Sequence, residues 1–418
     1  MLILGIIFAI VTIAIYLLYN GRLTPGLCLM ASWTFVYIVQ GIFARDMYFS
    51  AIAGFIVGVF CAAFLFGEYF GLGGSFGGSE YVNTKIPHRS LVFPPQFQRS
   101  LSIIICIVGL YAMIAIVNYY FLLKGFSSGA DDSILIPGVR EAIFADEIRL
   151  PGYIRIGITL AYVGVMFVLV YWILFGWKWY LIFPIISVVL FGFSQSGRAG
   201  TIIIMLQGFA AMYFRDVFFH RENPVQRFAY RTLTLLAITL AVFLGGQILR
   251  EGGEGGLDDL LRIFAQLRAY LFGGVSAFSY YVDYWMVDSR LSLGRYTFSS
   301  LFQALGLFAQ APGVYDEYAP ISTMGETTNL YTAFRSLIDD FKIPGCILFC
   351  IGAGYSSGRF FAGAVRGNVS NFAPLISFYA WTLFSPLFSL TYFNSFLAAM
   401  ILPWACIAYL LRAKRHPV

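Results

Sequence analysis

The chain has 418 residues, of which 59% are hydrophobic and only 11% are charged, against roughly a quarter charged in an ordinary soluble domain. This composition excludes a water-exposed globule, because too few polar side chains remain to cover its surface. The net charge of +6 does not indicate nucleic-acid binding, since the basic residues are scattered through loops and form no patch with interleaved aromatic residues.

Long uncharged apolar runs recur along the chain, and such a run crosses a hydrocarbon core of about 30 Å as a helix. Their hydrophobicity is continuous and does not alternate as in a membrane barrel. The first run has no basic segment before it and no small-residue cleavage site after it, so we expect a retained helix and not a signal peptide. We predict an all-α polytopic integral membrane protein, a single transmembrane domain over residues 1–418, with about eleven (ten to twelve) transmembrane helices at residues 2–19, 25–43, 50–67, 101–123, 153–175, 178–194, 200–215, 230–249, 343–363, 372–391 and 393–411.

The orientation of these helices follows from lysine and arginine, which accumulate in short cytoplasmic loops. Basic residues concentrate in the segment 215–231, in the loop 358–371 and in the C-terminal tail. We therefore place these three segments, and with them the C-terminus, on the cytoplasmic side. Alternation of the helices then puts the loop 68–100 inside, and it puts the N-terminus outside together with the loops 124–152, 195–199 and 250–342.

The large outer loop 250–342 is expected to contain amphipathic helix. From Gly256 onward, residues at spacings of four and three form one helical face, which is typical of a helix that lies on the membrane or caps the bundle: Leu257, Leu261, Phe264, Arg268 and Leu271. Arg268 interrupts this apolar face. Its guanidinium either extends to the membrane interface or faces an anion held near the bilayer surface.

Two further arginines are expected at the outer surface. Arg198 lies in the turn SQSGRAG among small residues that let a ligand approach closely, and its guanidinium forms a fork suited to phosphate; the alternative is an arginine that extends to the interface from a helix end. Arg250 and Glu251 precede glycines that let the loop fold over a site or serve as a plain hinge. With Arg268, these arginines form a candidate cage for a lipid-linked diphosphate.

The segment TMGETTNLYTAFRSLIDDFKIPG, residues 323–345, concentrates polar residues just before a predicted transmembrane helix: Glu326, Asn329, Tyr331, Thr332, Arg335, Asp339 and Asp340. Arg335 and Asp339 are one helical turn apart, so one interpretation is an ion pair on a solvated face. The other is a polar site for sugar hydroxyls in which a carboxylate serves as general base.

Neither a metal site nor a disulfide is expected. The outer loops contain no D-x-D pair or other carboxylate motif that binds a metal. The six cysteines all fall inside predicted transmembrane helices and form no C-x-x-C pair, so we expect them to be packing residues. The sequence therefore predicts no cofactor.

Three segments resemble a known family. GETTNLYTAFRSLIDDFKIPG looks like the G…N-x-Y-T…D-F-G…G signature of oligosaccharide repeat-unit polymerases, the Wzy-type O-antigen and capsule polymerases. The SGR turn at 196–198 is similar to a short arginine-containing turn in these proteins, and RAYLFGGVSAFSYY at 268–281 resembles their R-x-Y…G…F…Y segment. The likeness covers about residues 190–360. It departs from the signature at Lys342, where a glycine commonly follows the Asp-Phe pair.

The resemblance implies a metal-independent glycosyltransferase with a GT-C-like bundle in the inner membrane of a bacterium. Such a protein joins undecaprenyl-diphosphate-linked oligosaccharides on the periplasmic face, by transfer of the growing chain to the non-reducing end of a new lipid-linked unit. The product is O-antigen or a related surface polysaccharide. A chain-length regulator and a flippase are the implied protein partners.

The implied roles fall into three groups. The residues expected to bind the diphosphate and to stabilise its charge as the bond breaks are Arg198, Arg250, Arg268 and Arg335. The candidates for the catalytic base are Glu326, Asp339 and Glu251. The residues expected to contact sugars are Asn329, Tyr331, Thr332 and Tyr270.

Two alternatives remain open at this stage. An O-antigen ligase is expected to use a histidine of an outer loop, whereas the predicted topology puts all three histidines inside: His88, His220 and His416. A flippase or other transporter of lipid-linked sugars should place charged or helix-breaking residues near the middle of the membrane. The predicted helices are nearly free of charge in their middles, so the polymerase interpretation is favoured over both.

Overall fold

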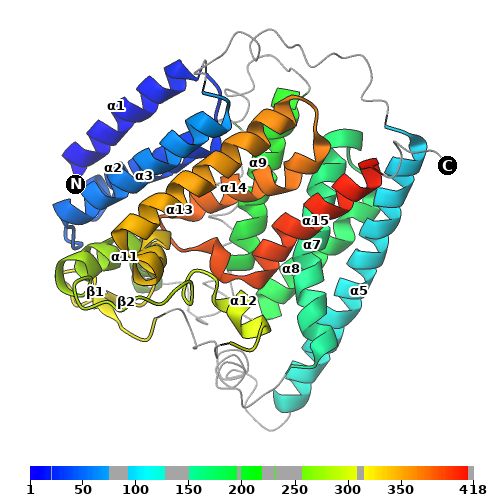
Figure 1. The fold of residues 1–418 in the computed structure, drawn as a ribbon. Helices are drawn as coiled ribbons and strands as arrows, with labels where there is room; N and C mark the ends of the chain where they lie inside the picture. Colours follow the sequence, from blue (N-terminus) through cyan, green and yellow to red (C-terminus); the bar gives the residue numbers. More distant parts are fainter. Residues whose placement is uncertain are drawn as a thin grey trace. The chain divides into compact units, whose positions relative to one another are not determined.

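The computed structural model describes residues 1–19, 21–74, 93–127, 150–194, 199–218, 230, 257–307 and 315–412, and this part of the chain is almost entirely helical (Figure 1). Five of the eleven expected runs form helices that are long and apolar enough to cross a membrane: α2 (Pro25–Phe43), α3 (Ala51–Gly71), α5 (Pro95–Ser127), α7 (Gly152–Phe175) and α15 (Asn394–Arg412). The all-α class expected of a membrane protein is thus confirmed. The run 230–249 lies outside the described residues except for Tyr230.

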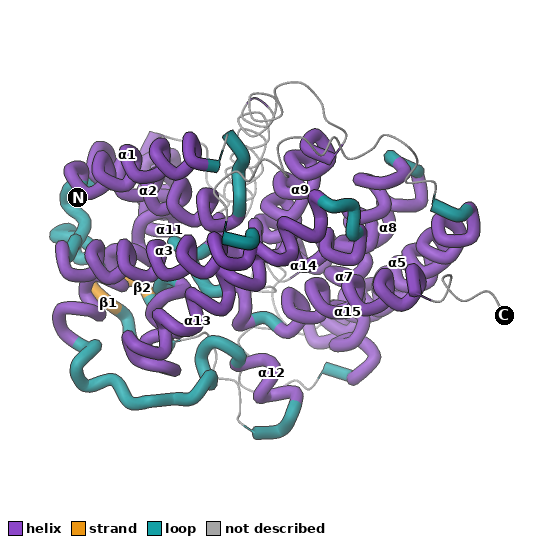
Figure 2. The backbone as a smooth tube through the Cα atoms, turned by 45° about the horizontal axis from the view of Figure 1, so that its top comes forward, coloured by secondary structure: helices purple, strands orange, loops and turns teal. Residues whose placement is uncertain are grey.

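Packing contacts divide the chain into two compact units. The first comprises Met1–Asn83, Val225–Ala362 and Trp381–Tyr392, and the second comprises Thr84–Pro224, Gly363–Ala380 and Phe393–Val418. Besides α2 and α3, the first unit holds α1 (Leu2–Leu18), α11 (Leu257–Tyr284), α12 (Ser299–Ala304), most of α13 (Ala333–Val365) and η3 (Leu390–Tyr392). It also holds the two short strands β1 (Ala319–Pro320) and β2 (Thr327–Thr328), which pair antiparallel and contact α11 (Figure 2).

The helices α3 and α13 approach each other through four glycines (Figure 1). A Cβ atom built on Gly67 would lie 2.0 Å from the carbonyl oxygen of Ile351, and one built on Gly354 would lie 2.0 Å from that of Phe64. Gly71 and Gly358 make similarly close contacts one turn further along. Each helix therefore contributes a Gly-x-x-x-Gly pair, a spacing that lets two membrane helices meet backbone to backbone.

Glu68 is completely buried at the same contact. Its Oε1 accepts hydrogen bonds from the backbone N–H of Gly26 at 2.9 Å and from the hydroxyl of Ser357 at 3.2 Å, and its Oε2 accepts one from the hydroxyl of Thr24 at 2.7 Å. Thr24 is the N-cap of α2, so the carboxylate lies where the helix presents unpaired N–H groups and partial positive charge. Glu68 thus joins α2, α3 and α13.

The helix expected from Gly256 onward is confirmed as α11, which begins at Leu257. Every residue from Phe272 to Ser279 is buried. Gln40 of α2 donates a 2.8 Å hydrogen bond to Ser276, and Ser50, the N-cap of α3, donates a 2.6 Å hydrogen bond to Asp283. The second half of α11 is therefore part of the core of the first unit.

The second unit is built around α7, in which residues 161–171 are all buried. In addition to α5, α7 and α15, this unit contains η1 (Trp179–Leu181), α8 (Ile182–Ser194), α9 (Ala199–Phe218), η2 (Val369–Asn371) and most of α14 (Phe372–Phe384). The guanidinium of Arg215 lies 4.9 Å from the ring centroid of Trp172, a cation–π contact between α9 and α7.

One predicted transmembrane helix is wrong. The run 372–391 is not one helix, because α14 ends at Phe384, a turn follows, and η3 begins only at Leu390. Pro386 explains the end, since a proline disfavours helical conformation in the residue before it. The run 343–363 is helical as expected: it is the part of α13 that follows the interruption at Lys342, and α13 itself begins earlier, at Ala333.

The glycine contact predicts opposite effects of two alanine substitutions in α13. Gly354→Ala should lower the thermal stability of the detergent-solubilised protein, because overpacking costs about 1–3 kcal/mol. Gly352→Ala is the matched control: no atom lies within 4 Å of its new Cβ, and alanine gains up to about 1 kcal/mol of helix propensity over glycine. Equal melting temperatures for the two variants would contradict the backbone contact.

Candidate functional site

The first part of α13 carries the polar residues of the segment 323–345. Residues 333–341 are helical, and the chain then adopts φ 56° and ψ 176° at Lys342, a conformation that is common only for glycine. The Lys342 amine donates hydrogen bonds to the backbone oxygen of Ser289 and, at 2.8 Å, to its hydroxyl. The break orients the short helical part independently of the apolar helix that follows it.

Arg335 lies in this short helical part, inside an aromatic cage. Its Cζ atom is 3.6 Å from the ring centroid of Tyr315 and 3.8 Å from that of Tyr331, with Tyr281 at 4.7 Å and Trp285 at 5.6 Å. The electron-rich faces of these rings replace part of the hydration that a buried guanidinium loses. Arg335 is only 4% exposed, so its position is fixed by the surrounding rings.

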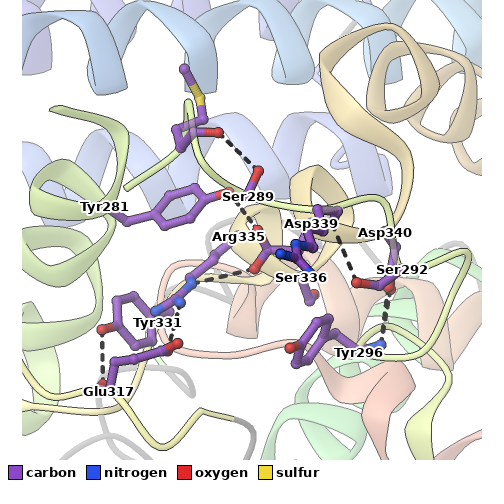
Figure 3. Close-up of polar contacts among 12 residues, drawn as sticks. Tyr281, Ser289, Ser292, Tyr296, Glu317, Tyr331, Arg335, Ser336, Asp339 and Asp340 are labelled. Carbon is purple, nitrogen blue, oxygen red and sulfur yellow. Dashed lines mark hydrogen bonds and ion pairs between the residues drawn. The ribbon is translucent and has the colours of Figure 1, made fainter. Parts of the chain in front are cut away.

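Two carboxylates accompany Arg335 (Figure 3). Its Nη2 donates a 2.9 Å hydrogen bond to Oε2 of Glu317, and its Nε lies 3.4 Å from Oδ2 of Asp339. The side chain of Glu317 is 60% exposed, whereas that of Asp339 is 7% exposed. The ion pair between Arg335 and Asp339 is thus confirmed, but its expected place on a solvated face is wrong, because loop residues cover both side chains.

Asp339 also accepts a 2.6 Å hydrogen bond from the Tyr281 hydroxyl. Burial raises the pKa of Asp339 above its ordinary value, and the Tyr281 hydrogen bond and the Arg335 charge oppose this shift without cancelling it. Burial likewise raises the pKa of Tyr281, so the shared proton stays on the phenol. Both carboxylate oxygens of Asp339 are therefore engaged by protein groups.

The neighbouring Asp340 holds the loop that follows α11. Its carboxylate accepts hydrogen bonds from the backbone N–H groups of Tyr296, at 3.1 Å, and Thr297, at 2.6 Å (Figure 3). Asp340 is completely buried, and burial raises its pKa while these N–H groups lower it. Asp340 thus shapes the cage indirectly, since Tyr296 stacks on Tyr315 with ring centroids 5.0 Å apart.

Arg268 forms a second cluster in the same unit. Its Nη1 donates a 2.8 Å hydrogen bond to Asp46, in the loop between α2 and α3, and its Nη2 donates a 2.9 Å hydrogen bond to Glu326. The side chains of Arg268 and Glu326 are 22% and 24% exposed. Arg268 therefore faces carboxylates of its own chain at the edge of the unit.

The four residues expected to contact sugars differ in their environment. Tyr331 and Thr332 are buried, and the Tyr331 hydroxyl donates a 3.1 Å hydrogen bond to the backbone oxygen of Glu317. The Asn329 amide donates a 3.4 Å hydrogen bond to the backbone oxygen of Tyr315. Tyr270 is 37% exposed on α11. Tyr331 thus forms a wall of the cage, and Tyr270 is the aromatic residue of this group that reaches the surface.

The structure brings together Arg335, Asp339 and Tyr331 in one cluster and Arg268 with Glu326 in another. The predicted residues Arg198, Arg250 and Glu251 lie outside the described residues. The sequence analysis missed Asp46 and the residues of the segment 315–317. Asp46 follows an apolar helix on the predicted outer side, so the alternation of the helices was a signal that it faces the loop 250–342.

Comparison with known proteins identifies no relative. No protein-family model, no curated protein and no solved structure matches this chain. Among the described residues, no group of three or more histidine, cysteine, aspartate or glutamate side chains is placed to hold a metal ion.

The role of Asp340 predicts a local effect. Asp340→Asn places an amide NH2 group against backbone N–H donors, and loss of this buried acceptor should cost about 1–3 kcal/mol. Hydrogen exchange should become faster at the amides of Tyr296 and Thr297. The Leu293 amide donates to the backbone oxygen of residue 340 and is the internal control. Unchanged exchange at Tyr296 and Thr297 would contradict the role of the carboxylate.

The raised pKa of Asp339 predicts a pH-dependent effect of Tyr281→Phe. A carboxyl group whose pKa is higher in the folded state contributes most stability at low pH, and this contribution is lost as the pH rises through the folded pKa. Removal of the Tyr281 hydroxyl should raise that pKa further. The melting temperature should therefore fall increasingly below that of the parent as the pH rises from about 4.

The control for this effect is Tyr318→Phe, which removes an exposed phenol, whereas Tyr281 is the phenol that donates to Asp339. Its melting temperature should follow the parent at every pH. A constant difference between Tyr281→Phe and the parent would show that the hydroxyl does not act on the ionisation of Asp339.

Proposed function

We propose that this protein polymerises undecaprenyl-diphosphate-linked oligosaccharide units into O-antigen or a related surface polysaccharide, on the periplasmic face of a bacterial inner membrane. The growing chain is transferred from its lipid carrier to the non-reducing end of a new lipid-linked unit. Apolar helices of membrane-spanning length support the location. The eleven helices, the outer loop 250–342 and the cytoplasmic C-terminus are parts of this proposal.

The observation that carries the proposal is that two of the segments resembling repeat-unit polymerases pack against each other. The segment 268–281 contacts the segment 325–345 at both of its ends, through the ion pair between Arg268 and Glu326 and the hydrogen bond from Tyr281 to Asp339. A chance likeness of each segment to the family signature would not predict contacts between the two segments. The packing is expected if the segments form one functional site.

The backbone at Lys342 adds support. The family signature commonly has a glycine after the Asp-Phe pair, and this chain has a lysine there. The lysine nevertheless adopts φ 56° and ψ 176°, a conformation that favours glycine. The departure in sequence is therefore not accompanied by a departure in local backbone geometry.

The chemistry of such a transfer requires charge stabilisation more than covalent catalysis. The diphosphate is already a good leaving group, so the protein has to position it and neutralise the charge that develops as the glycosidic bond breaks. We assign this task to Arg268 and Arg335 together with Arg198 and Arg250. Arginine suits it because its planar fork binds phosphate oxygens in pairs.

Among the candidate bases, Glu326 is the better placed of the two described residues. Asp339 is buried, with one oxygen bound by Tyr281 and the other beside Arg335. Glu326 is partly exposed and contacts Arg268, the proposed diphosphate ligand. A carboxylate at the surface reaches an acceptor hydroxyl without rearrangement of the cage. Glu251 remains a candidate for the catalytic base because it follows Arg250 in the sequence.

The contacts of the first unit agree with the proposed sidedness. Asp46, expected on the outer side, contacts Arg268 of the outer loop. At the other ends of α2 and α3, Thr24 contacts Glu68, and Glu68 contacts Ser357 near the loop predicted to be cytoplasmic. No contact among these residues joins segments that the proposed topology puts on opposite sides.

The test is genetic complementation: cells from which the gene for this protein has been deleted are supplied with the parent or a variant. Arg268→Ala and Arg198→Ala should insert into the membrane at parent levels and yield surface glycolipid that carries a single repeat unit in place of long chains. Arg268→Lys should restore little, because lysine lacks the paired donors. Arg290→Ala is the matched control, since Arg290 is an exposed arginine of the same outer loop.

Gel separation of the surface polysaccharide by size provides the measurement. Normal ladders of long chains from both Arg268→Ala and Arg198→Ala would exclude the proposed arginine cage. Synthesis of long chains by cells without the protein would exclude the polymerase function itself.

A further inference from the structure

The ion pair between Arg335 and Glu317 joins two side chains of very different exposure. The guanidinium is almost completely buried, whereas the Glu317 side chain is 60% exposed at a distance of 2.9 Å. We propose that the Glu317 carboxylate is an internal competitor, which occupies in the free protein the position of the phosphate or diphosphate group assigned to Arg335. This inference rests on the proposed function, because it assigns the site to the same lipid-linked substrate.

The Arg335 guanidinium offers a ligand the nitrogen that contacts Glu317. The rings of Tyr315 and Tyr331 lie 3.6 and 3.8 Å from Cζ, and Nε lies against Asp339. Nη2 is bound only by Glu317 among the described residues, and Nη1 is buried without a hydrogen-bond partner there. A ligand with two oxygen acceptors that replaces Glu317 would satisfy both nitrogens of the fork.

The Glu317 side chain can move away from Arg335 while the backbone around it stays in place. Its backbone oxygen is held by the Tyr331 hydroxyl, and the backbone oxygen of Tyr315 is held by Asn329. The side chain itself reaches Arg335 (Figure 3) and is 60% exposed. An exposed carboxylate gains little from an ion pair because water solvates it equally well. Rotation of the Glu317 side chain alone therefore uncovers the edge of the guanidinium.

The chemical class of the ligand follows from the properties of the guanidinium. Arg335 is rigidly held and keeps its charge, since the surrounding phenols and carboxylates raise its already high pKa despite burial. A fixed, planar, permanently charged fork matches phosphate oxygens. A phosphate carries more negative charge than the single carboxylate that it replaces, and it brings a second acceptor for Nη1. A neutral sugar offers neither advantage.

The test measures binding of inorganic pyrophosphate and of undecaprenyl phosphate to the full-length protein in detergent, by calorimetry. Glu317→Gln removes the internal competitor and should tighten binding about two- to fivefold, because an ion pair with an exposed carboxylate contributes little to an equilibrium. Asp316→Asn is the matched control, because it removes the same charge from the exposed residue beside Glu317, and Glu317 is the one of the two that binds Arg335. Asp316→Asn should bind as the parent does.

Arg335→Lys should bind neither compound. A second variant, Glu317→Ala, keeps the inference testable where Arg335→Lys does not fold, because the exposed Glu317 side chain does not support the core. Binding by Glu317→Gln and Glu317→Ala that is no tighter than binding by Asp316→Asn would overturn the inference. Tighter binding of undecaprenyl phosphate with unchanged binding of pyrophosphate would support it and identify a lipid headgroup as the ligand.

The outcome is independent of the test of the proposed function. Tighter binding by the Glu317 variants in a protein that makes no polysaccharide would support the anion site and reject the polymerase. Long polysaccharide from the parent, combined with binding by the Glu317 variants that equals that of the control, would reject the anion site and leave the polymerase standing.

Discussion

A guanidinium that is withdrawn from water must be compensated by charge and by polarisable groups, since the cost of dehydration otherwise exceeds any gain from packing. Arg335 imposes this requirement on the first unit. Tyr281 and Trp285 come from the end of α11, Tyr315 from the segment before β1, and Tyr331 from the segment before α13, and their rings converge on one cation. Segments with little regular structure of their own are thereby held in a defined arrangement.

The position of this cation depends in turn on how α13 is anchored. The glycine contact holds α13 close to α3. Ser357 of α13 and the N-terminus of α2 both donate hydrogen bonds to the buried carboxylate of Glu68. The break at Lys342 then separates the anchored, apolar part of the helix from the short part that carries Arg335. The strained residue therefore sets the direction of the short part relative to the anchored part.

The sequence predicts those features that depend on neighbours along the chain. Continuous hydrophobicity predicts the apolar helices, a repeat of four and three residues predicts α11, and a spacing of one turn predicts the pair between Arg335 and Asp339. It does not predict that this pair is buried, because the covering rings come from distant segments whose approach no local pattern encodes. Glu317 was missed for the same reason. The Gly-x-x-x-Gly pairs of α3 and α13 were visible in the sequence, but which helix faces which is a tertiary property.

The two arginine clusters share a property that constrains how the site works. Arg268 contacts Asp46 and Glu326, and Arg335 contacts Glu317 and Asp339. Each cluster thus has two carboxylates and one guanidinium. While both carboxylates are in place, neither cluster has positive charge left to attract a small anion from solution. In the proposed function, the diphosphate of the substrate displaces a carboxylate before either arginine binds it. In the proposed function, binding energy from the sugars and the lipid adds to that of the diphosphate, so the complete lipid-linked substrate binds more tightly than free pyrophosphate.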